Sequence, residues 1–188
     1  MSSFARRALT SAALTVAATG ALALTAAPAF AIGPSTVTKS GNILVVTASP
    51  GSQNTYRILE DASSFFIRDV TGGGVRPAAG SGCANENGTG QVRCAKTGIT
   101  QVIVNAGDFD DNIGLGAPAG SQVRFEIRSG AGNDAVAVTA PGTTVRGEGG
   151  NDNLANNSFQ FPTVLDGGAG TDRCTSRNRA DTRISCES

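Results

Sequence analysis

Histidine and tryptophan are both absent from the 188 residues, which contain one tyrosine, one methionine and eight phenylalanines. Without histidine, the chain cannot assemble a Ser-His-Asp or Cys-His catalytic arrangement, and it lacks the commonest general base of enzymes. Charge is also sparse, because 15 basic and 15 acidic residues make up only 16% of the chain. The composition therefore disfavours most hydrolases, and the lack of a basic excess disfavours nucleic acid as a partner.

The first 31 residues have the features of a secretory signal peptide. Arg6 and Arg7 precede an apolar stretch, residues 8–27, that carries no charge. Small residues then stand at both positions that an exporting peptidase reads, which predicts cleavage after Ala31. A retained membrane anchor is the alternative, but several Thr and Ser residues dilute the stretch. We expect a secreted, extracellular chain with 13 basic and 15 acidic residues, a net charge of about −2 and no membrane span.

The four cysteines form two close pairs, Cys83 with Cys94 and Cys174 with Cys186. Four cysteines allow three connectivities, and local pairing is the natural choice because each pair closes a loop of about a dozen residues. An exported chain folds where disulfides form. A zinc site is the alternative, but the chain has no histidine and no Cys-x-x-Cys spacing.

Short β-prone segments alternate with turn residues in the first part of the mature chain. These segments cover residues 42–47, 56–59, 65–70 and 101–104. Their length and spacing predict strands, and no helical periodicity accompanies them.

Residues 104–174 contain a motif that occurs four times and can be aligned on an aspartate. The four aspartates are Asp111, Asp134, Asp152 and Asp172. Seven residues before each stands an aliphatic residue: Val104, Ile127, Val145 and Leu165. Two residues after each stands an apolar residue or cysteine: Ile113, Val136, Leu154 and Cys174. Glycine occupies the second and fourth positions before the aspartate, except at Phe109 and Glu148.

The four turns read AGDFDDNI, SGAGNDAV, GEGGNDNL and GGAGTDRC. They resemble the Gly-Gly-x-Gly-x-Asp-x-apolar repeat of the RTX, or haemolysin-type, calcium-binding family, and the whole sequence looks like a small secreted actinobacterial member of it. The resemblance implies a β-solenoid with Ca²⁺ between the turns of successive coils. The aspartates are 23, 18 and 20 residues apart, whereas the densest repeats of the family have nine residues, which suggests one calcium turn per coil.

We therefore predict an all-β chain, a parallel β-solenoid of the β-roll or β-helix kind with about one Gly/Asp-rich turn per coil and disulfide caps. Plainer turns at 118–121 and 141–143 would close the other side of each coil, and the long first interval predicts a protruding loop. Residues 1–31 are the signal peptide, 32–100 the N-terminal strand region with the Cys83/Cys94 loop, and 101–188 the repeats with a C-terminal cap. We expect 32–188 to form one continuous domain.

Calcium prefers six to eight oxygen ligands, which carboxylates and the carbonyls of a glycine-rich turn can supply. The resemblance implies metal ligation by the four aspartates together with neighbouring polar residues and glycines. The neighbours are Asp108, Asp110, Asn133, Asn151, Gly130, Gly132, Gly147, Gly150, Gly167 and Gly170. Stacked carboxylates repel one another, so we expect metal binding and folding to be coupled. Ordinary Gly-Asn-Asp turns that bind no metal are the alternative.

The sequence thus predicts a secreted calcium-binding protein with a structural or interaction role and no enzymatic activity. A cell-wall or other extracellular partner is compatible with this prediction. The alternative is a calcium-dependent β-helix enzyme, such as a polysaccharide lyase in which an arginine abstracts a proton. Arg124, Arg128 and Arg146 lie on predicted strands near the turns and are the candidates for that role.

Overall fold

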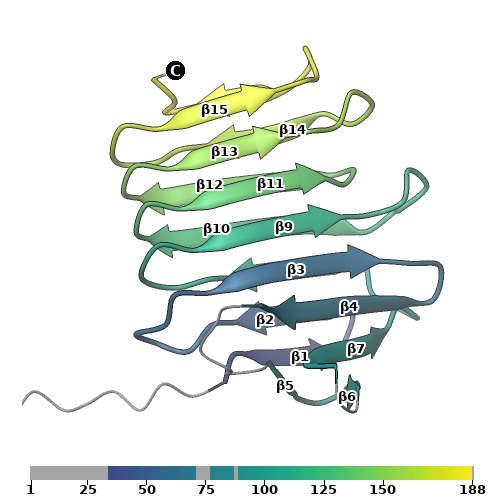
Figure 1. Ribbon diagram of the computed structural model, residues 1–188. Helices are drawn as coiled ribbons and strands as arrows, with labels where there is room; N and C mark the ends of the chain where they lie inside the picture. The colour runs from purple at the N-terminus through teal and green to yellow at the C-terminus, as the bar shows by residue number, and fades with distance from the viewer. Residues whose placement is uncertain (1–33, 71–76, 87–88, 188) are drawn as a thin grey trace, which may run out of the picture.

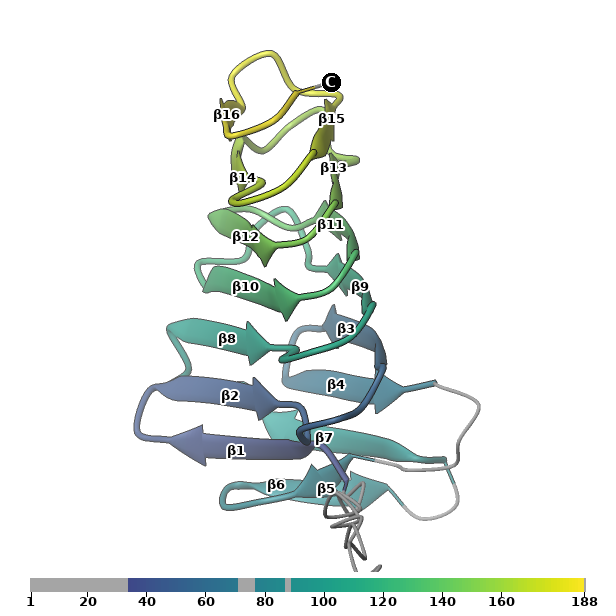
Figure 2. The ribbon, with the colours of Figure 1, turned by 90° about the vertical axis from the view of Figure 1, so that its left-hand side faces the viewer.

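The computed structural model describes residues 34–70, 77–86 and 89–187, so the predicted signal peptide lies outside the described residues. All sixteen secondary-structure elements of the described part are β-strands, arranged in two eight-stranded sheets that face each other (Figures 1 and 2). The all-β prediction is confirmed.

Each sheet takes alternate parts of the chain. The first sheet contains β1 (Thr36–Ser40), β2 (Ile43–Thr47), β5 (Ala78–Ala79), β8 (Gln101–Asn105), β10 (Arg124–Ala131), β12 (Thr143–Gly149), β14 (Thr163–Asp166) and β16 (Thr182–Ile184). The second sheet contains β3 (Thr55–Glu60), β4 (Ser64–Asp69), β6 (Cys83–Glu86), β7 (Gln91–Ala95), β9 (Asn112–Gly116), β11 (Ala135–Thr139), β13 (Asn153–Asn156) and β15 (Arg173–Ser176). Both sheets continue from the N-terminal strands into the repeats, because β2 pairs with β8 and β3 pairs with β9.

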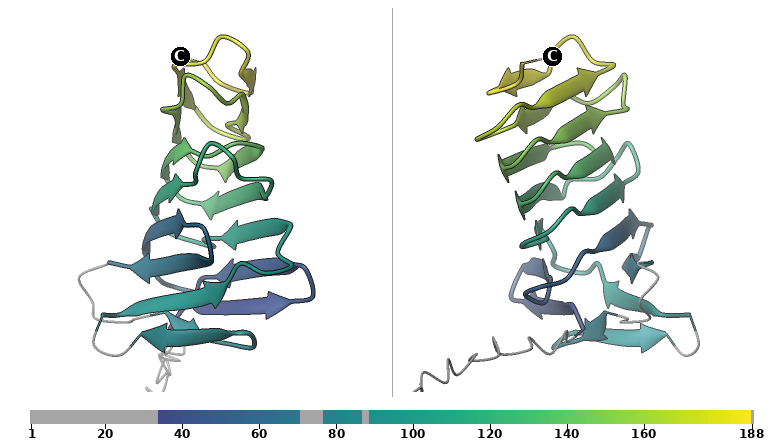
Figure 3. Two further views of the ribbon diagram at one scale, coloured as in Figure 1. Left: turned by 90° about the vertical axis from the view of Figure 1, so that its right-hand side faces the viewer. Right: turned by 60° about the vertical axis from the view of Figure 1, so that its left-hand side comes forward.

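From β8 to β16 the chain alternates between the sheets, and from β10 on every strand pairs in parallel with the strand two places earlier. We call one strand of each sheet, with the connection between them, a repeat unit. Figure 2 shows these units one above another, and Figure 3 shows the stack narrowing towards the C-terminus.

The N-terminal strands do not follow the predicted parallel arrangement. β1 pairs antiparallel with β2, and β4 pairs antiparallel with both β3 and β7. Only residues 41–42 separate β1 from β2, and so short a loop can form only a hairpin, because parallel neighbours need a crossover of a dozen residues or more. Each sheet is therefore mixed. Its parallel pairs are those of the repeats and their junctions, together with the short β1–β5 pair at the edge of the first sheet.

The interior contains the two apolar sets predicted from the repeat, each forming a column across paired strands. Val104, Ile127, Val145 and Leu165 are direct partners across β8, β10, β12 and β14. Ile113, Val136, Leu154 and Cys174 are direct partners across β9, β11, β13 and β15. All eight are buried, and a fully buried aliphatic side chain typically contributes about 1.5–3 kcal/mol to stability.

The connections on one side of the stack differ in length. Residues 117–123 join β9 to β10, whereas residues 140–142 join β11 to β12. Figure 1 shows the longer connection projecting beyond its shorter neighbour, as the 23-residue interval predicts. The additional residues thus leave the stacked strands undisturbed.

Both predicted disulfides are present. Cys83–Cys94 joins β6 to β7 at one edge of the second sheet, and Cys174–Cys186 ties β15 to the segment that follows β16. Unpaired sheet edges tend to open or to recruit other strands, so each bond secures an edge. Two disulfides are typical of proteins that fold in an oxidising compartment outside the cytosol.

Candidate functional site

The four repeated aspartates lie in the connections that leave the first sheet and enter the second. Each follows β8, β10, β12 or β14, and the strand of the second sheet begins at the next residue. These connections form the left-hand side of the stack in Figure 1 and face the viewer in Figure 2. The sheet register therefore places equivalent turns of successive repeat units directly over one another.

All four turns share one backbone conformation. The residues four and two positions before each aspartate have positive φ, between 71° and 145°. Phe109 and Glu148 have φ of 71°, although left-handed backbone is unfavourable for residues with a side chain. At Gly150, a Cβ would lie 1.8 Å from the carbonyl oxygen of Gly132 in the preceding unit. A side chain would clash with that turn, so the close stacking of the turns requires glycine at position 150.

The side chains of Asp111, Asp134, Asp152 and Asp172 form what we call the inner column. The Oδ1 atom of each aspartate accepts a hydrogen bond from the backbone N–H at the equivalent position of the preceding unit. Asp111 N–H donates to Asp134 at 2.7 Å, Asp134 N–H to Asp152 at 2.8 Å, and Asp152 N–H to Asp172 at 2.8 Å. Each carboxylate thus fixes the turn before it.

The second carboxylate oxygen of each inner-column aspartate has no partner. All four side chains are buried, with exposed fractions of 1–2%, and each Oδ2 atom lacks a hydrogen-bond partner among the residues that the structure describes. No described lysine or arginine forms an ion pair with them. A buried charge without a partner is costly, so a proton or a bound cation must compensate these oxygens.

Two glycines lie directly against these carboxylates. At Gly147, a Cβ would lie 2.1 Å from Asp152 Oδ2 and 2.3 Å from the carbonyl oxygen of Gly167. At Gly167, a Cβ would lie 2.5 Å from Asp172 Oδ2 and 2.1 Å from the carbonyl oxygen of Ser185. Glycine at both positions therefore leaves space in which an unpaired carboxylate oxygen and a backbone carbonyl of the next unit lie close together.

Burial changes the acid–base behaviour of the inner column. Loss of hydration raises the pKa of Asp111 to about 7 and that of Asp152 to about 6, and neighbouring aspartates add to both shifts. Burial also raises the pKa of Asp134. The Ser129 hydroxyl beside it donates to the carbonyls of Arg146 and Gly147. Asp111 and Asp152 therefore take up protons closer to neutral pH than ordinary aspartates do when no cation is bound.

The residues immediately before the inner-column aspartates form a second, exposed set, which we call the outer column. Its members are Asp110, Asn133, Asn151 and Thr171. In this set, a side-chain oxygen accepts a hydrogen bond from the backbone N–H of the equivalent residue in the following unit. Asn133 N–H donates to Asp110 Oδ1 at 2.7 Å, Asn151 N–H to Asn133 Oδ1 at 2.8 Å, and Thr171 N–H to Asn151 Oδ1 at 2.8 Å. These side-chain oxygens are used in stacking and face solvent, away from the inner column.

Asp108, another predicted ligand, also lies apart from the inner column. Both of its carboxylate oxygens accept a hydrogen bond from the backbone N–H of Gly51, at 2.8 and 3.1 Å. Among the described residues, no three acidic or cysteine side chains converge on a single point. The carboxylates are instead distributed along the stack, about one in each repeat unit.

The repeat motif did not predict the residues that lie at the two ends of the inner column. Asn54 N–H donates to Asp111 Oδ1 at 2.6 Å, so Asn54 occupies the equivalent position in the unit before the first motif. At the other end, Asp172 N–H donates to the carboxylate of Glu187. Neither residue follows a glycine-rich turn. Only the alternation of apolar residues near Asn54 offered a sequence signal.

The arginines of the predicted lyase alternative lie on the outer face of the first sheet. Arg128 and Arg146 form ion pairs with Glu126, whose pKa the hydrogen bond from Arg128 lowers. Arg124 is exposed on β10. Two of the three candidates are therefore held in ion pairs with Glu126 on the surface.

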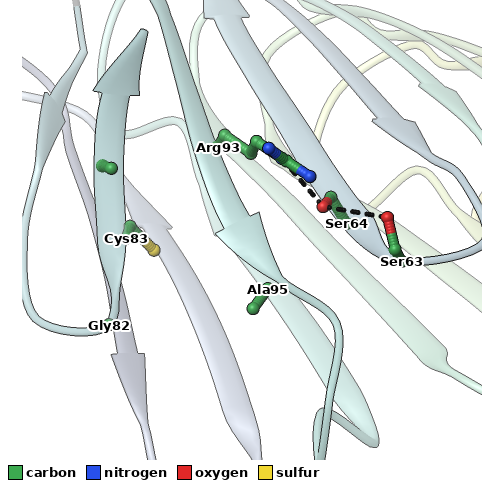
Figure 4. Close-up of a pocket in the computed structure, with 7 residues that line it drawn as sticks. Ser63, Ser64, Gly82, Cys83, Arg93 and Ala95 are labelled. Carbon is green, nitrogen blue, oxygen red and sulfur yellow. Dashed lines mark hydrogen bonds between the residues drawn. The ribbon is translucent and has the colours of Figure 1, made fainter.

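A separate pocket of about 380 Å³ lies near the N-terminal disulfide, between β4, β6 and β7 (Figure 4). Among the described residues that line it, Arg93 is the only charged one. Its Nε donates to the Ser64 hydroxyl at 3.0 Å, and its guanidinium lies over the Phe66 ring, 5.9 Å from the centroid. The other described lining residues are Ser63, Gly82, Cys83, Ala84 and Ala95.

No protein-family model, curated protein or solved structure matches the chain. In the part of the chain that the structure describes, no helix is long and apolar enough to cross a membrane.

Proposed function

We propose that this chain is a secreted calcium-binding protein in which Ca²⁺ joins successive turns of a β-solenoid formed by the repeat units. The role is structural or interactive, and the RTX-like motif is the sequence basis of the proposal. The observation that carries it is the inner column: four consecutive buried carboxylates, each with one oxygen that has no partner among the described residues.

The donor set fits calcium. Calcium takes hard oxygen ligands in flexible geometry, whereas zinc and other transition metals favour histidine and cysteine. The turns offer only oxygens, because the chain has no histidine and its cysteines are bonded to one another. Around Asp152 and Asp172, the unpaired Oδ2 atom lies close to a carbonyl of the next unit, so carboxylates and backbone carbonyls of adjacent units would hold the ion together.

A bound divalent cation would supply the positive charge that the inner column lacks. Like charges about 4.8 Å apart repel by roughly 3 kcal/mol at an effective dielectric of 20. Without a cation, burial and, to a smaller extent, the neighbouring carboxylates raise the pKa values of Asp111 and Asp152, so these two side chains take up protons more readily than ordinary aspartates. Calcium and protons therefore compete for the same oxygens.

Secretion agrees with this function. Extracellular calcium modules commonly have dissociation constants of about 10⁻⁴–10⁻³ M, and calcium outside cells is abundant enough to fill them. The two disulfides suit an oxidising environment. The chain would then be ordered fully only after export.

The test is a thermal melt of the mature chain, with disulfides intact, after chelation and across a calcium titration at pH 7.5. Binding at 100 times Kd stabilises the fold by about 2.7 kcal/mol per site. A shift of about 2–4 °C for each kcal/mol is typical at this chain length. Magnesium serves as the control because it demands a stricter octahedral geometry.

We expect a calcium-specific rise of at least about 5 °C, and isothermal titration calorimetry at the same pH should give the number of ions. An unchanged melting temperature together with no heat of binding would refute the proposal. The inner column would then serve only to join successive turns through its hydrogen bonds.

A further inference from the structure

The last described residues fold back onto the final Asp turn. β16 pairs in parallel with β14, with Asp166 opposite Ile184, and Gly167 N–H donates to the Ile184 carbonyl at 2.9 Å. Cys186 is bonded to Cys174. The segment 184–187 therefore lies over the turn that contains Asp172, in the place of a further repeat unit.

Glu187 reproduces the hydrogen bonds of that missing unit. In each earlier unit, the residue after the aspartate donates its N–H to the carbonyl of the preceding aspartate, as Arg173 does to Asp152 at 2.8 Å. Glu187 N–H donates in the same way to the Asp172 carbonyl at 2.8 Å. Its carboxylate also accepts from the Asp172 N–H, as each inner-column aspartate does for its predecessor.

The Glu side chain explains how so short a segment can do this. Four residues lie between Gly167 and Asp172 in the last full turn, but only one lies between Ser185 and Glu187. Glu187 thus occupies the backbone position that follows the aspartate, and its extra methylene group lets the carboxylate reach back to the Asp172 N–H. Ser185 adopts a positive φ of 48°, like the glycines of the complete turns.

The oxygens at this end match those of a complete turn. The Ser185 carbonyl and the unpaired Asp172 Oδ2 both lie against Gly167, as the Gly167 carbonyl and Asp152 Oδ2 lie against Gly147. Asp172 is 1% exposed, and its Oδ2 has no partner among the described residues. Within the same part of the chain, neither Asp172 nor Glu187 forms an ion pair.

We infer that Glu187, Asp172 and the Ser185 carbonyl form an additional divalent-cation site at the C-terminal end of the inner column. This site rests on the proposed function, since it uses the same carboxylate chemistry. The motif alone defines three intervals between four aspartates, and Glu187 adds a fourth. The Cys174–Cys186 bond holds the truncated turn in place.

The test compares calcium stoichiometry in the mature, disulfide-bonded chain and two matched variants by equilibrium dialysis and calorimetry. Glu187→Gln removes the charge but keeps an oxygen that can accept the Asp172 N–H. Glu86→Gln is the control, because Glu86 also accepts one neutral N–H donor, Gln91 Nε2 at 2.7 Å, but lies on β6 far from the turns. We expect E187Q to bind one calcium ion fewer than the wild type and E86Q to bind the wild-type number.

Two outcomes would overturn the inference, and they are distinguishable. If the wild type binds calcium and E187Q binds the same number with the same affinity, Glu187 is only a hydrogen-bond acceptor that ends the column, and the proposed function stands. If the wild type binds no calcium, the proposed function fails and the additional site fails with it.

A second measurement needs no variant. Anomalous diffraction from crystals of the wild-type protein grown with calcium should show a peak 2.3–2.6 Å from a Glu187 carboxylate oxygen, the usual calcium–oxygen distance. Peaks at the other turns but none at Glu187 would overturn the inference even if E187Q failed to fold.

Discussion

Substitution of Asp152 by asparagine should change stability in opposite directions with and without calcium. The asparagine Oδ1 can still accept the Asp134 N–H, now at 2.8 Å from the aspartate. Its Nδ2 replaces the unpaired oxygen and can donate to the Gly167 carbonyl beside it. Asp152→Asn therefore removes a buried charge and fills an unsatisfied position when no cation is present.

The magnitude follows from the pKa of Asp152, which burial raises from 3.8 to about 6. A shift of about two units corresponds to roughly 3 kcal/mol at alkaline pH, and solvent screening at the turn reduces this to about 1–2 kcal/mol. In chelator at pH 8, D152N should therefore melt roughly 2–8 °C above the wild type. In saturating calcium it should melt below the wild type, because Asp152 lies between two proposed calcium sites and its carboxylate would be a ligand in both. Loss of even one bound ion would lower the free energy of unfolding by about 2.7 kcal/mol.

The assay is differential scanning calorimetry of both proteins at pH 8, in chelator and in calcium. Asp110→Asn is the matched control in chelator, because Asp110 is exposed and also accepts one backbone N–H, at 2.7 Å. This substitution should change the free energy of unfolding by less than about 0.5 kcal/mol. A D152N variant less stable than the wild type in chelator would refute the buried-charge argument. An undiminished response of D152N to calcium would refute its role in binding.

Two further predictions concern the metal-free protein. The folded-state pKa values of Asp111, about 7, and Asp152, about 6, lie above the value in the unfolded chain. The stability that bound protons provide is therefore complete below pH 4 and is lost as the pH rises to 7. Urea unfolding in chelator should show the free energy of unfolding falling between pH 4.5 and 7.5, and a rise would contradict this prediction. Gly150→Ala should lower the free energy of unfolding by more than about 3 kcal/mol, because its Cβ would lie 1.8 Å from a backbone carbonyl oxygen. Gly120→Ala is the control: Gly120 has open space around it, so this change should lower stability by less than about 0.5 kcal/mol. Equal melting temperatures for the two variants would contradict the stacked-turn geometry.

The repeat could be read from the sequence because its period fixes the register of parallel strands. Two side chains one unit apart must become direct partners when every unit contributes one strand to each sheet, as Val104 and Ile127 do. The same logic brought the four aspartates into one column. The local spacing of the cysteines was also sufficient, because each pair closes a short loop.

Other features could not be predicted from the motif. The antiparallel N-terminal pairs depend on which strands become neighbours in space, and β4 pairs with β7 although 21 residues lie between them. The sequence also placed Asp110 beside Asp111 as an additional ligand of the first turn. The structure separates them: Asp110 is exposed and accepts the Asn133 N–H, whereas Asp111 is buried in the inner column.

The sequence by itself determined the four Asp turns, the apolar columns, the disulfide pairs and the oxygen-bearing side chains of the turns, because these depend on residue type and period. Only the tertiary structure decided that one oxygen of each inner-column carboxylate is satisfied and the other is not. It also decided that Asn54 and Glu187 end the column. The physical reason is that hydrogen bonding and desolvation depend on which groups meet between units, and residues far apart in the chain, or outside the motif, supply those groups.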